Sequence, residues 1–233
     1  MDRKLDLNAR AEEVREKKIY KTVQFEANEI LERFNKNIEE IKKQSELISD
    51  LKDDNLEFYK DILRTQIVFL DSAFDFYMHE ITKYGMCKIY DGVWKRTEKF
   101  NNYTIKMKDL YDVENEGRNT NWFVEIVNRN SSTEVYMSKE SVIDQLKLIG
   151  LDWQQIANDA FYEEGDTEKP VDKFKRAIQS LFIRRNIIAH QADCIHQTAE
   201  KNDISEEEVD THLENIFKIV GAINTRLIEK DRE

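Results

Sequence analysis

The chain is almost free of the two residues that break helices. Its 233 residues include only six glycines and one proline, whereas these two types make up roughly 12% of an average protein. Sandwiches and barrels need many turns, which are rich in glycine and proline, so this scarcity argues against them. Charged residues reach 36% and apolar residues 40%, a mixture typical of amphipathic helices. The sequence therefore predicts an all-α fold of long helices.

Charge and cysteine usage exclude several protein classes. The net charge of −11 argues against a non-specific nucleic-acid coat. Cys87 and Cys194 stand far apart without metal-ligand spacing, which favours a reduced, cytoplasmic protein with no metal and no cofactor. The opening MDRKLDLNAR has no apolar run, and the longest uninterrupted apolar stretch is short (67–70). We therefore expect neither a signal peptide nor membrane association.

The first part of the chain predicts a charged helical extension over residues 1–52, followed by the main helical domain over 53–233. Apolar residues recur in this extension at helical spacing, at Ile30, Phe34, Ile38, Ile41, Ile48 and Leu51. Such a stripe must pack on something. Two interpretations remain open, a helix lying on the domain and a coiled-coil arm for self-association.

The most apolar segment predicts a helix from about 56 to 84 that ends at Gly85. Asp71, Asp75 and His79 follow one another at spacings of four, so they lie on nearly one face of this helix. Buried acids need partners, and this face is the first sign of a polar site. Residues 91–137 are less regular and are expected to form a small irregular insertion. Within it, 103–108 alternates like a short strand, and 122–130 fits either a strand or a helix.

Helix signals are clearer in the second half. Ser138 is a candidate N-cap for 139–149, with Gly150 as the stop, and 153–161 reads as a further helix. Pro170 is expected to begin a helix that reaches at least His190. Ser205 and Glu208 form a capping box. Apolar residues follow it at spacings of four and three, which suits packing in a bundle, at Val209, Leu213, Ile216, Val220, Ile223 and Leu227.

The segment RRNIIAHQAD (184–193) places two arginines and a histidine in an otherwise apolar helix. At 100° per residue, Asn186 and His190 lie about 40° apart and share a face, whereas Arg185 and His190 lie about 140° apart. Either the helix is distorted there, or a second copy of the chain completes the site across a two-fold axis. The plain structural alternative is an arginine paired with acids of the preceding helix beside a core histidine.

Positive charge is concentrated in two segments. Residues 83–108 hold seven cations and two acids, a net charge of +5, and residues 171–190 hold five cations and one acid, a net charge of +4. Local basic segments on an acidic chain favour a confined polyanion site. Aromatic residues that could stack bases interleave with the first segment. Candidate RNA-binding residues are Lys95, Arg96, Lys99, Lys173 and Arg176.

These segments together resemble the HEPN superfamily, and its RiboL-PSP branch in particular. The carrying features are RRNIIAHQAD, the acid–aromatic–His–Glu pattern in DFYMHE (75–80), a segment SKESVIDQLKLIGLDWQQIA before the arginine helix, and a closing helix ISEEEVDTHLENIFKIVGAI. The resemblance covers roughly residues 56–230. It implies an all-helical bundle that dimerises through the motif helices and acts as a metal-independent endoribonuclease. By motif position, the catalytic residues would be Arg185, Asn186 and His190, with Asp75, His79, Arg184 and Asp193 as supporting residues.

The resemblance also implies a biological setting and an alternative. Such RNases resemble toxins or effectors of bacterial antiviral defence and toxin–antitoxin systems, so a homodimer, an RNA substrate and an antitoxin or other regulatory protein are the expected partners. The alternative is a non-catalytic nucleotide- or RNA-binding module, or a helical dimerisation module. A purely structural coiled-coil adaptor is a third hypothesis, in which Arg185 and His190 would matter for stability alone.

Overall fold

The computed structural model describes residues 24–48, 51–115, 122–131, 134–195 and 197–233. The expectation for 1–23 lies outside these ranges. The described residues form helices and no strand, which confirms the all-α fold class. The helices are α1 (Ala27–Ile48), α2 (Leu51–Asp54), α3 (Leu56–Tyr90), α4 (Glu98–Asn101), α5 (Met107–Asn115), α6 (Trp122–Ser131), α7 (Lys139–Leu148), α8 (Trp153–Phe161), α9 (Pro170–Gln191) and α10 (Glu206–Asp231).

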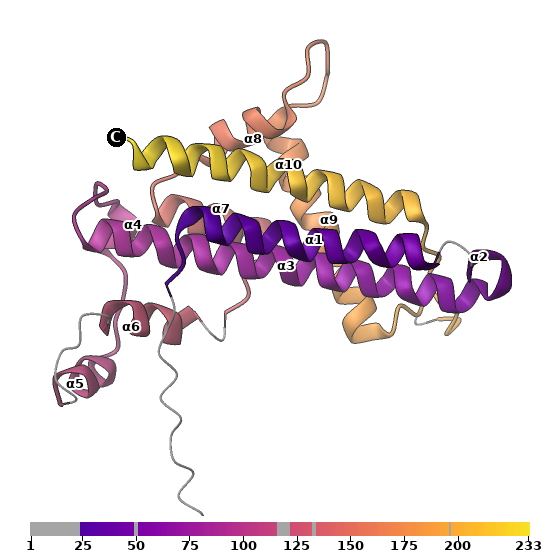
Figure 1. Cartoon of the computed structure of the whole chain (residues 1–233), viewed down its shortest axis with the longest axis horizontal. Helices are drawn as coiled ribbons and strands as arrows, with labels where there is room; N and C mark the ends of the chain where they lie inside the picture. The colour runs from indigo at the N-terminus through magenta and orange to yellow at the C-terminus, as the bar shows by residue number, and fades with distance from the viewer. Residues whose placement is uncertain (1–23, 49–50, 116–121, 132–133, 196) are drawn as a thin grey trace, which may run out of the picture.

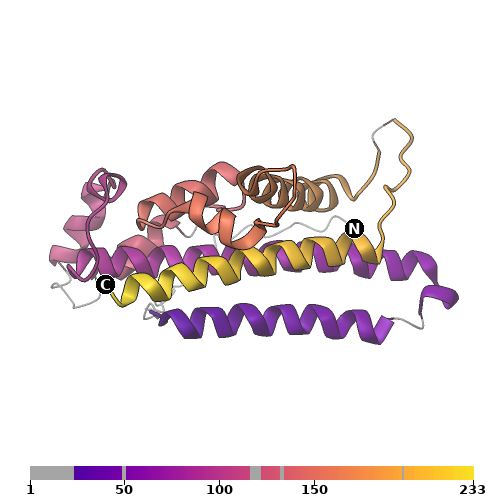
Figure 2. The same ribbon diagram turned by 90° about the horizontal axis from the view of Figure 1, so that it is seen from above.

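The long helices are arranged in layers around α3 (Figure 1). Seen from above, α1 forms one outer layer, α3 and α10 form the middle layer, and α7, α8 and α9 cover the other side (Figure 2). The short helices α5 and α6 lie together at one end of the body. The core therefore sits on both faces of α3, which is buried along most of its length.

Helix α1 packs on the domain. Its apolar stripe at Ile30, Phe34, Ile38 and Ile41 is almost completely buried and belongs to the common core, and its neighbours are α3 and α10. The side chains of Ile48 and Leu51 lie outside the described residues. Of the two interpretations of this stripe, the packed helix is confirmed and the coiled-coil arm is wrong.

Helix α3 does not end at Gly85, so the predicted stop is wrong. The helix continues to Tyr90. A Cβ atom at Gly85 would lie 2.7 Å from Ile149 Cβ and 2.8 Å from Trp94 Cζ3. A side chain at position 85 would clash with these atoms. The glycine therefore lets the uninterrupted helix pass close to the end of α7 and to the Trp94 ring.

The segment 91–137 is more helical than expected. Within its described part lie α4, α5 and α6, so the predicted strand at 103–108 is wrong and the open choice at 122–130 is settled as helix. Thr97 starts α4 by accepting a hydrogen bond from the Phe100 amide (2.9 Å). Short apolar runs carry no decisive periodicity, and tertiary packing decided these segments.

The predicted caps are correct. Ser138 accepts from the Ser141 amide, Pro170 occupies the first turn of α9, and Gly150 has a positive φ of 72°. Ser205 accepts from the Glu208 amide at the start of α10, and the predicted apolar stripe of α10 is buried. Among the described residues, no helix combines the length and the apolar composition that a membrane span requires.

Candidate active site on α9

Arg185 is held in place by a buried carboxylate of α3. Its Nε donates to Asp71 Oδ2 at 2.7 Å, and its Nη1 donates to Asn186 Oδ1 at 2.9 Å. The Asp71 side chain is fully buried, whereas Arg185 keeps about a fifth of its side chain exposed. Asp71 Oδ1 has no hydrogen-bond partner among the described residues. Buried Asp71 thus fixes the orientation of the guanidinium group, while part of the group stays accessible to solvent. An arginine that binds an anion needs both.

The environment of Asp71 changes its acidity. Burial raises the pKa of Asp71 to about 6, against the opposing attraction of Arg185, and nearby Asp75 adds to the rise. At neutral pH most Asp71 side chains are therefore ionised and paired with Arg185. Protonation below about pH 6 would remove the charge that holds the arginine.

This raised pKa predicts a pH dependence of stability. An unfolded aspartate has a pKa of about 3.9, so between pH 4 and 6 the folded chain binds more protons at Asp71 than the unfolded chain. The contribution of Asp71 to the free energy of unfolding should therefore fall by roughly 2 kcal/mol as pH rises through this range. We expect Asp71→Asn to lack this decrease. Urea unfolding of both proteins between pH 4 and 7 measures it, and a constant difference between them would contradict the raised pKa.

Asp75 and His79 form a second polar group one turn further along α3. Asp75 Oδ1 accepts from the Tyr136 amide at 2.8 Å, and its Oδ2 lies 3.6 Å from His79 Nε2. The His79 ring stacks on Tyr136, with 4.1 Å between ring centroids, and its Nε2 lies 3.2 Å from the carbonyl oxygen of Glu134. The segment after α6 therefore fixes both side chains facing outward from α3.

Arg185 of α9 and the pair Asp75 and His79 of α3 line one cleft between α3, α6 and α9. The cleft has a volume of about 300 Å³, and its polar lining includes Ser72, Asp75, His79, Lys83, Asn128 and Arg185. Lys83 is nearly buried and paired with Glu80 at 2.7 Å. The predicted face of α3 and the predicted arginine of α9 are thus brought together in one polar cavity.

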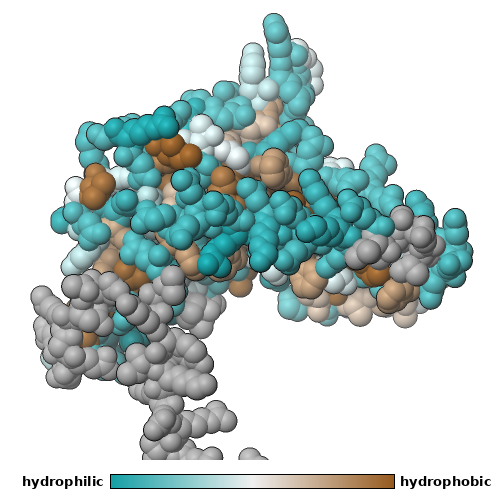
Figure 3. Space-filling model, in the orientation of Figure 1, coloured by the Kyte–Doolittle hydropathy of each residue, from teal (hydrophilic) through white to brown (hydrophobic). Residues whose placement is uncertain are grey.

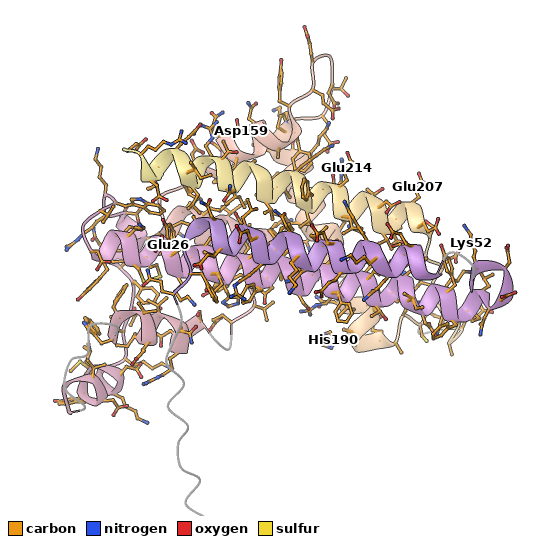
Figure 4. The ribbon with its side chains drawn as sticks, in the orientation of Figure 1. Glu26, Lys52, Asp159, His190, Glu207 and Glu214 are labelled. Carbon is orange, nitrogen blue, oxygen red and sulfur yellow. The ribbon has the colours of Figure 1, made fainter. Side chains whose placement is uncertain are left out.

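His190 is not part of this cleft. It lies near the end of α9, exposed to solvent, without a hydrogen bond or ion pair to a described residue. Figure 4 places it at the edge of the molecule, opposite Asp159 and Glu214. Helix α9 is continuous through both motif positions, so His190 stands about 7.5 Å further along the axis than Arg185. No helix distortion brings the two side chains together within one chain.

Arg184 and Asp193 belong to a separate, structural cluster. Asp193 is fully buried and accepts from Arg64 Nε (2.6 Å), from Asn202 Nδ2 (3.1 Å) and from Arg184. Arg184 also donates to Glu208 (2.7 Å). Burial pushes the pKa of Asp193 upward, but the hydrogen bonds from Arg184 and Arg64 outweigh it and hold the pKa below its usual value. The cluster ties the end of α9 to α3 and α10.

The candidate RNA-binding residues lie in two different places. Lys95 and Arg96 are exposed after α3 and make no ion pair with a described residue. Lys99 bonds Asp144 at 2.6 Å. Lys173 and Arg176, near the start of α9, pair with Glu163, Asp166 and Glu168. These two stand about 18 and 13 Å along the helix axis from Arg185, so the structure does not gather them at the cleft.

Sequence reasoning missed Lys83, which lines the cleft, and the buried Asp71, which holds Arg185. The spacing Asp71–Asp75–His79 was visible in the sequence, yet Asp71 was not assigned to the site, although it contacts Arg185 directly. Lys83 follows His79 at the next helical turn and gave the same periodic signal. Among the described residues, no three His, Cys, Asp or Glu side chains are placed to hold a metal ion.

Comparison with known proteins gives one family. The family model described as RiboL-PSP-HEPN matches residues 32–229. This range includes α3, α9, all of α10 but its last two residues, and all the residues of the cleft. No curated protein and no solved structure matches the chain.

Proposed function

Because the chain belongs to the RiboL-PSP-HEPN family, we propose that it is a metal-independent endoribonuclease. Many members of the HEPN superfamily are RNases. The observation that carries the proposal is Arg185, fixed by buried Asp71 and open to the cleft that Asp75 and His79 also line. A permanently charged donor group held in this way suits a phosphodiester.

The proposed reaction uses the nucleophile that RNA itself carries. The 2′-hydroxyl oxygen attacks the adjacent phosphorus, the bond to the 5′-oxygen breaks, and the products are a 2′,3′-cyclic phosphate and a 5′-hydroxyl. Arg185 stabilises charge on the phosphoryl oxygens, Asn186 positions the phosphate, and His190 transfers a proton. Asp71 orients Arg185, and Asp75 and His79 line the cleft beside it.

A homodimer would supply the histidine that is missing from the cleft. The outer face of α3 carries apolar residues at spacings of four, seven and seven, namely Phe58, Ile62, Phe69 and Phe76, with Thr65 and Ser72 at the turns between them. Phe58, Phe69 and Phe76 remain 53%, 48% and 38% exposed, and Ile183 of α9 is 48% exposed. An exposed apolar stripe of this kind favours a partner helix. Hydrophobic side chains reach the surface along the lower edge beneath α1 (Figure 3).

The stripe runs directly into the cleft, because Phe76 lines the same cavity as Arg185. A second copy seated on this face by two-fold symmetry would place its own α9 beside the first. We propose that the active site is composite, with Arg185 of one protomer and His190 of its partner facing one phosphate.

The biological role follows by analogy with the family alone. We propose a cytoplasmic toxin or effector in bacterial antiviral defence or a toxin–antitoxin system. A nuclease of this kind needs restraint in the resting cell, so an antitoxin or another regulatory protein is the expected partner. Such a partner would bind the same apolar stripe on α3 and would thereby compete with dimerisation.

One assay tests the proposed reaction. Purified protein is incubated in EDTA with a short RNA and with the same oligonucleotide made entirely of 2′-deoxynucleotides. We expect cleavage of the RNA, with cyclic phosphate and 5′-hydroxyl ends, and an intact DNA strand, because DNA lacks the attacking hydroxyl. Cleavage that requires a divalent ion, or DNA cleavage at a similar rate, would contradict the proposal.

A non-catalytic nucleotide-binding module remains the second candidate. The observation that favours it is the position of His190, which lies outside the cleft in the single chain. A dimer that binds nucleotides tightly and leaves all RNA intact would support this function instead.

A further inference from the structure

A larger cavity continues from the cleft along α3. It has a volume of about 580 Å³ and lies among α3, α4, α6 and α7, which gather around one end of α3 (Figure 1). His79, Lys83 and Ser131 line both this cavity and the cleft of Arg185. The volume falls in the range of small-molecule sites, roughly 300–1,000 Å³. A molecule whose phosphate lies at Arg185 can therefore extend into the second cavity past His79.

Two polar atoms of this cavity are buried without a partner. Thr82 is only 3% exposed, yet its hydroxyl makes no hydrogen bond to a described residue, and the Oε1 atom of Gln145 is likewise buried without a partner in the described part of the chain. The two residues come from α3 and α7, and both line the cavity. Unpaired buried polar atoms are rare in native proteins because each costs free energy. A ligand that offers both a donor and an acceptor would satisfy them.

The two lysines that line the cavity are each paired with an acidic side chain. Lys83 pairs with Glu80 at 2.7 Å, and Lys99 pairs with Asp144 at 2.6 Å. The cavity thus has no free cation among these lysines to hold a phosphate, in contrast to the cleft with Arg185. A neutral, polar group fits this part of the site better than an anion.

Aromatic side chains complete the lining. The stacked pair of His79 and Tyr136 borders the cavity, and Tyr103 borders it as well. Aromatic faces stack planar rings, and proteins that bind single-stranded RNA use them to hold unstacked bases. A nucleobase is a flat, neutral ring system with hydrogen-bond donors and acceptors at its edge, so it fits this lining.

We propose that this cavity binds one nucleobase of the RNA, the one next to the phosphate held at Arg185. The inference rests on the proposed function and adds base selectivity to it. Thr82 and Gln145 hydrogen-bond the edge of the base, and they are specificity-determining residues. The enzyme therefore prefers one base, or one class of base, at a fixed position beside the cut.

The test compares cleavage preferences of the wild type, Thr82→Val and Gln145→Leu. Each protein cleaves a pool of RNAs with random sequence, and sequencing of the product ends gives the base preference at each position. Thr82→Val keeps the size of the side chain, Gln145→Leu shortens it by one atom, and each removes the polar group. We expect the wild type to prefer one base beside the cut, and each variant to lose about tenfold of that preference.

Thr225→Val is the matched control. Thr225 is exposed on α10, and its hydroxyl donates to the carbonyl oxygen of Gly221. The variant should therefore show the same base preference as the wild type. A wild type that cuts without base preference, or variants that keep the full preference, would overturn the inference and leave the proposed reaction standing.

A separate binding experiment covers the case in which the reaction itself fails. If the wild type cuts no RNA, the proposed function fails, and binding of adenosine, guanosine, cytidine and uridine is measured by NMR titration. Saturable binding of one nucleoside that both variants weaken about tenfold would support the cavity as a nucleobase site for a free nucleotide. Absence of binding to all four would overturn it.

Discussion

Replacing His190 by alanine is expected to lower RNA cleavage by about 10²–10⁴-fold, because this is the usual contribution of a general acid or base. His190 is exposed and makes no hydrogen bond to a described residue, so the fold should not change. Initial cleavage rates of a short RNA in EDTA measure the loss, and thermal unfolding verifies the fold. Gln191→Ala is the matched control, because Gln191 is the neighbouring exposed residue at the end of α9.

Mixing two inactive variants tests the composite site. His190→Ala and Arg185→Ala protomers, when mixed and allowed to exchange, form heterodimers in half of the population. If Arg185 of one protomer works with His190 of its partner, each heterodimer keeps one intact site. Activity should then return to about a quarter of the wild-type level. A mixture as inactive as its components would show that both residues must come from one chain, or that the site is not composite.

Asp193→Ala is expected to cost about 3 kcal/mol of the free energy of unfolding. The carboxylate is fully buried and is shared by Arg64 and Arg184, and removal of one partner from a buried ion cluster leaves charge uncompensated. The backbone adds to the effect, because Asp193 has a φ of 59°, a conformation that alanine disfavours. Urea unfolding at pH 7 measures the change.

Asp193→Asn separates the two causes. Asparagine tolerates the left-handed conformation and keeps one hydrogen-bond acceptor, so it should lose clearly less stability than alanine. Arg64 retains Asp61 and the carbonyl oxygen of Asn202, and Arg184 retains Glu208, which limits the damage in both variants. Equal losses for the two substitutions would assign the effect to the charge alone, and a loss below 1 kcal/mol for alanine would contradict the structural role of the cluster.

Local signals in the sequence predicted much of the fold. Ser138 and Ser205 predicted the starts of α7 and α10, because a cap depends only on the residues next to it. Gly85 misled for the opposite reason, since its role depends on Ile149, more than sixty positions away in the sequence. The strand predicted at 103–108 was wrong and the choice at 122–130 stayed open, because short helices are selected by what they pack on and leave little periodic pattern.

In the candidate site, too, local patterns predicted some residues, whereas contacts between distant segments were not predicted. The motif pointed to Arg185 and Asn186, and the spacing on α3 pointed to Asp75 and His79, and the structure places all four around the cleft or in contact with it. The structural alternative of an arginine paired with acids of the preceding helix also holds for Arg185, although its core histidine is wrong because His190 is exposed. Which acid pairs with Arg185 depends on how α9 crosses α3, and no local pattern encodes this crossing. Arg184 was expected to support the catalytic Arg185, yet one step along the helix turns it toward Asp193 and Glu208.

The length of α3 limits how a chain of this kind can vary in evolution. One uninterrupted helix of 35 residues carries Arg64 of the Asp193 cluster, Asp71 and His79 of the cleft, and Thr82 of the adjoining cavity. Insertion or deletion of a single residue between 64 and 82 would turn every later side chain by about 100°. It would separate these groups from Arg185 on α9, from Asp193 just after α9 and from Tyr136 before α7. Changes in length are therefore tolerable only outside this helix, for example between α4 and α6, where insertions leave the register of α3 untouched.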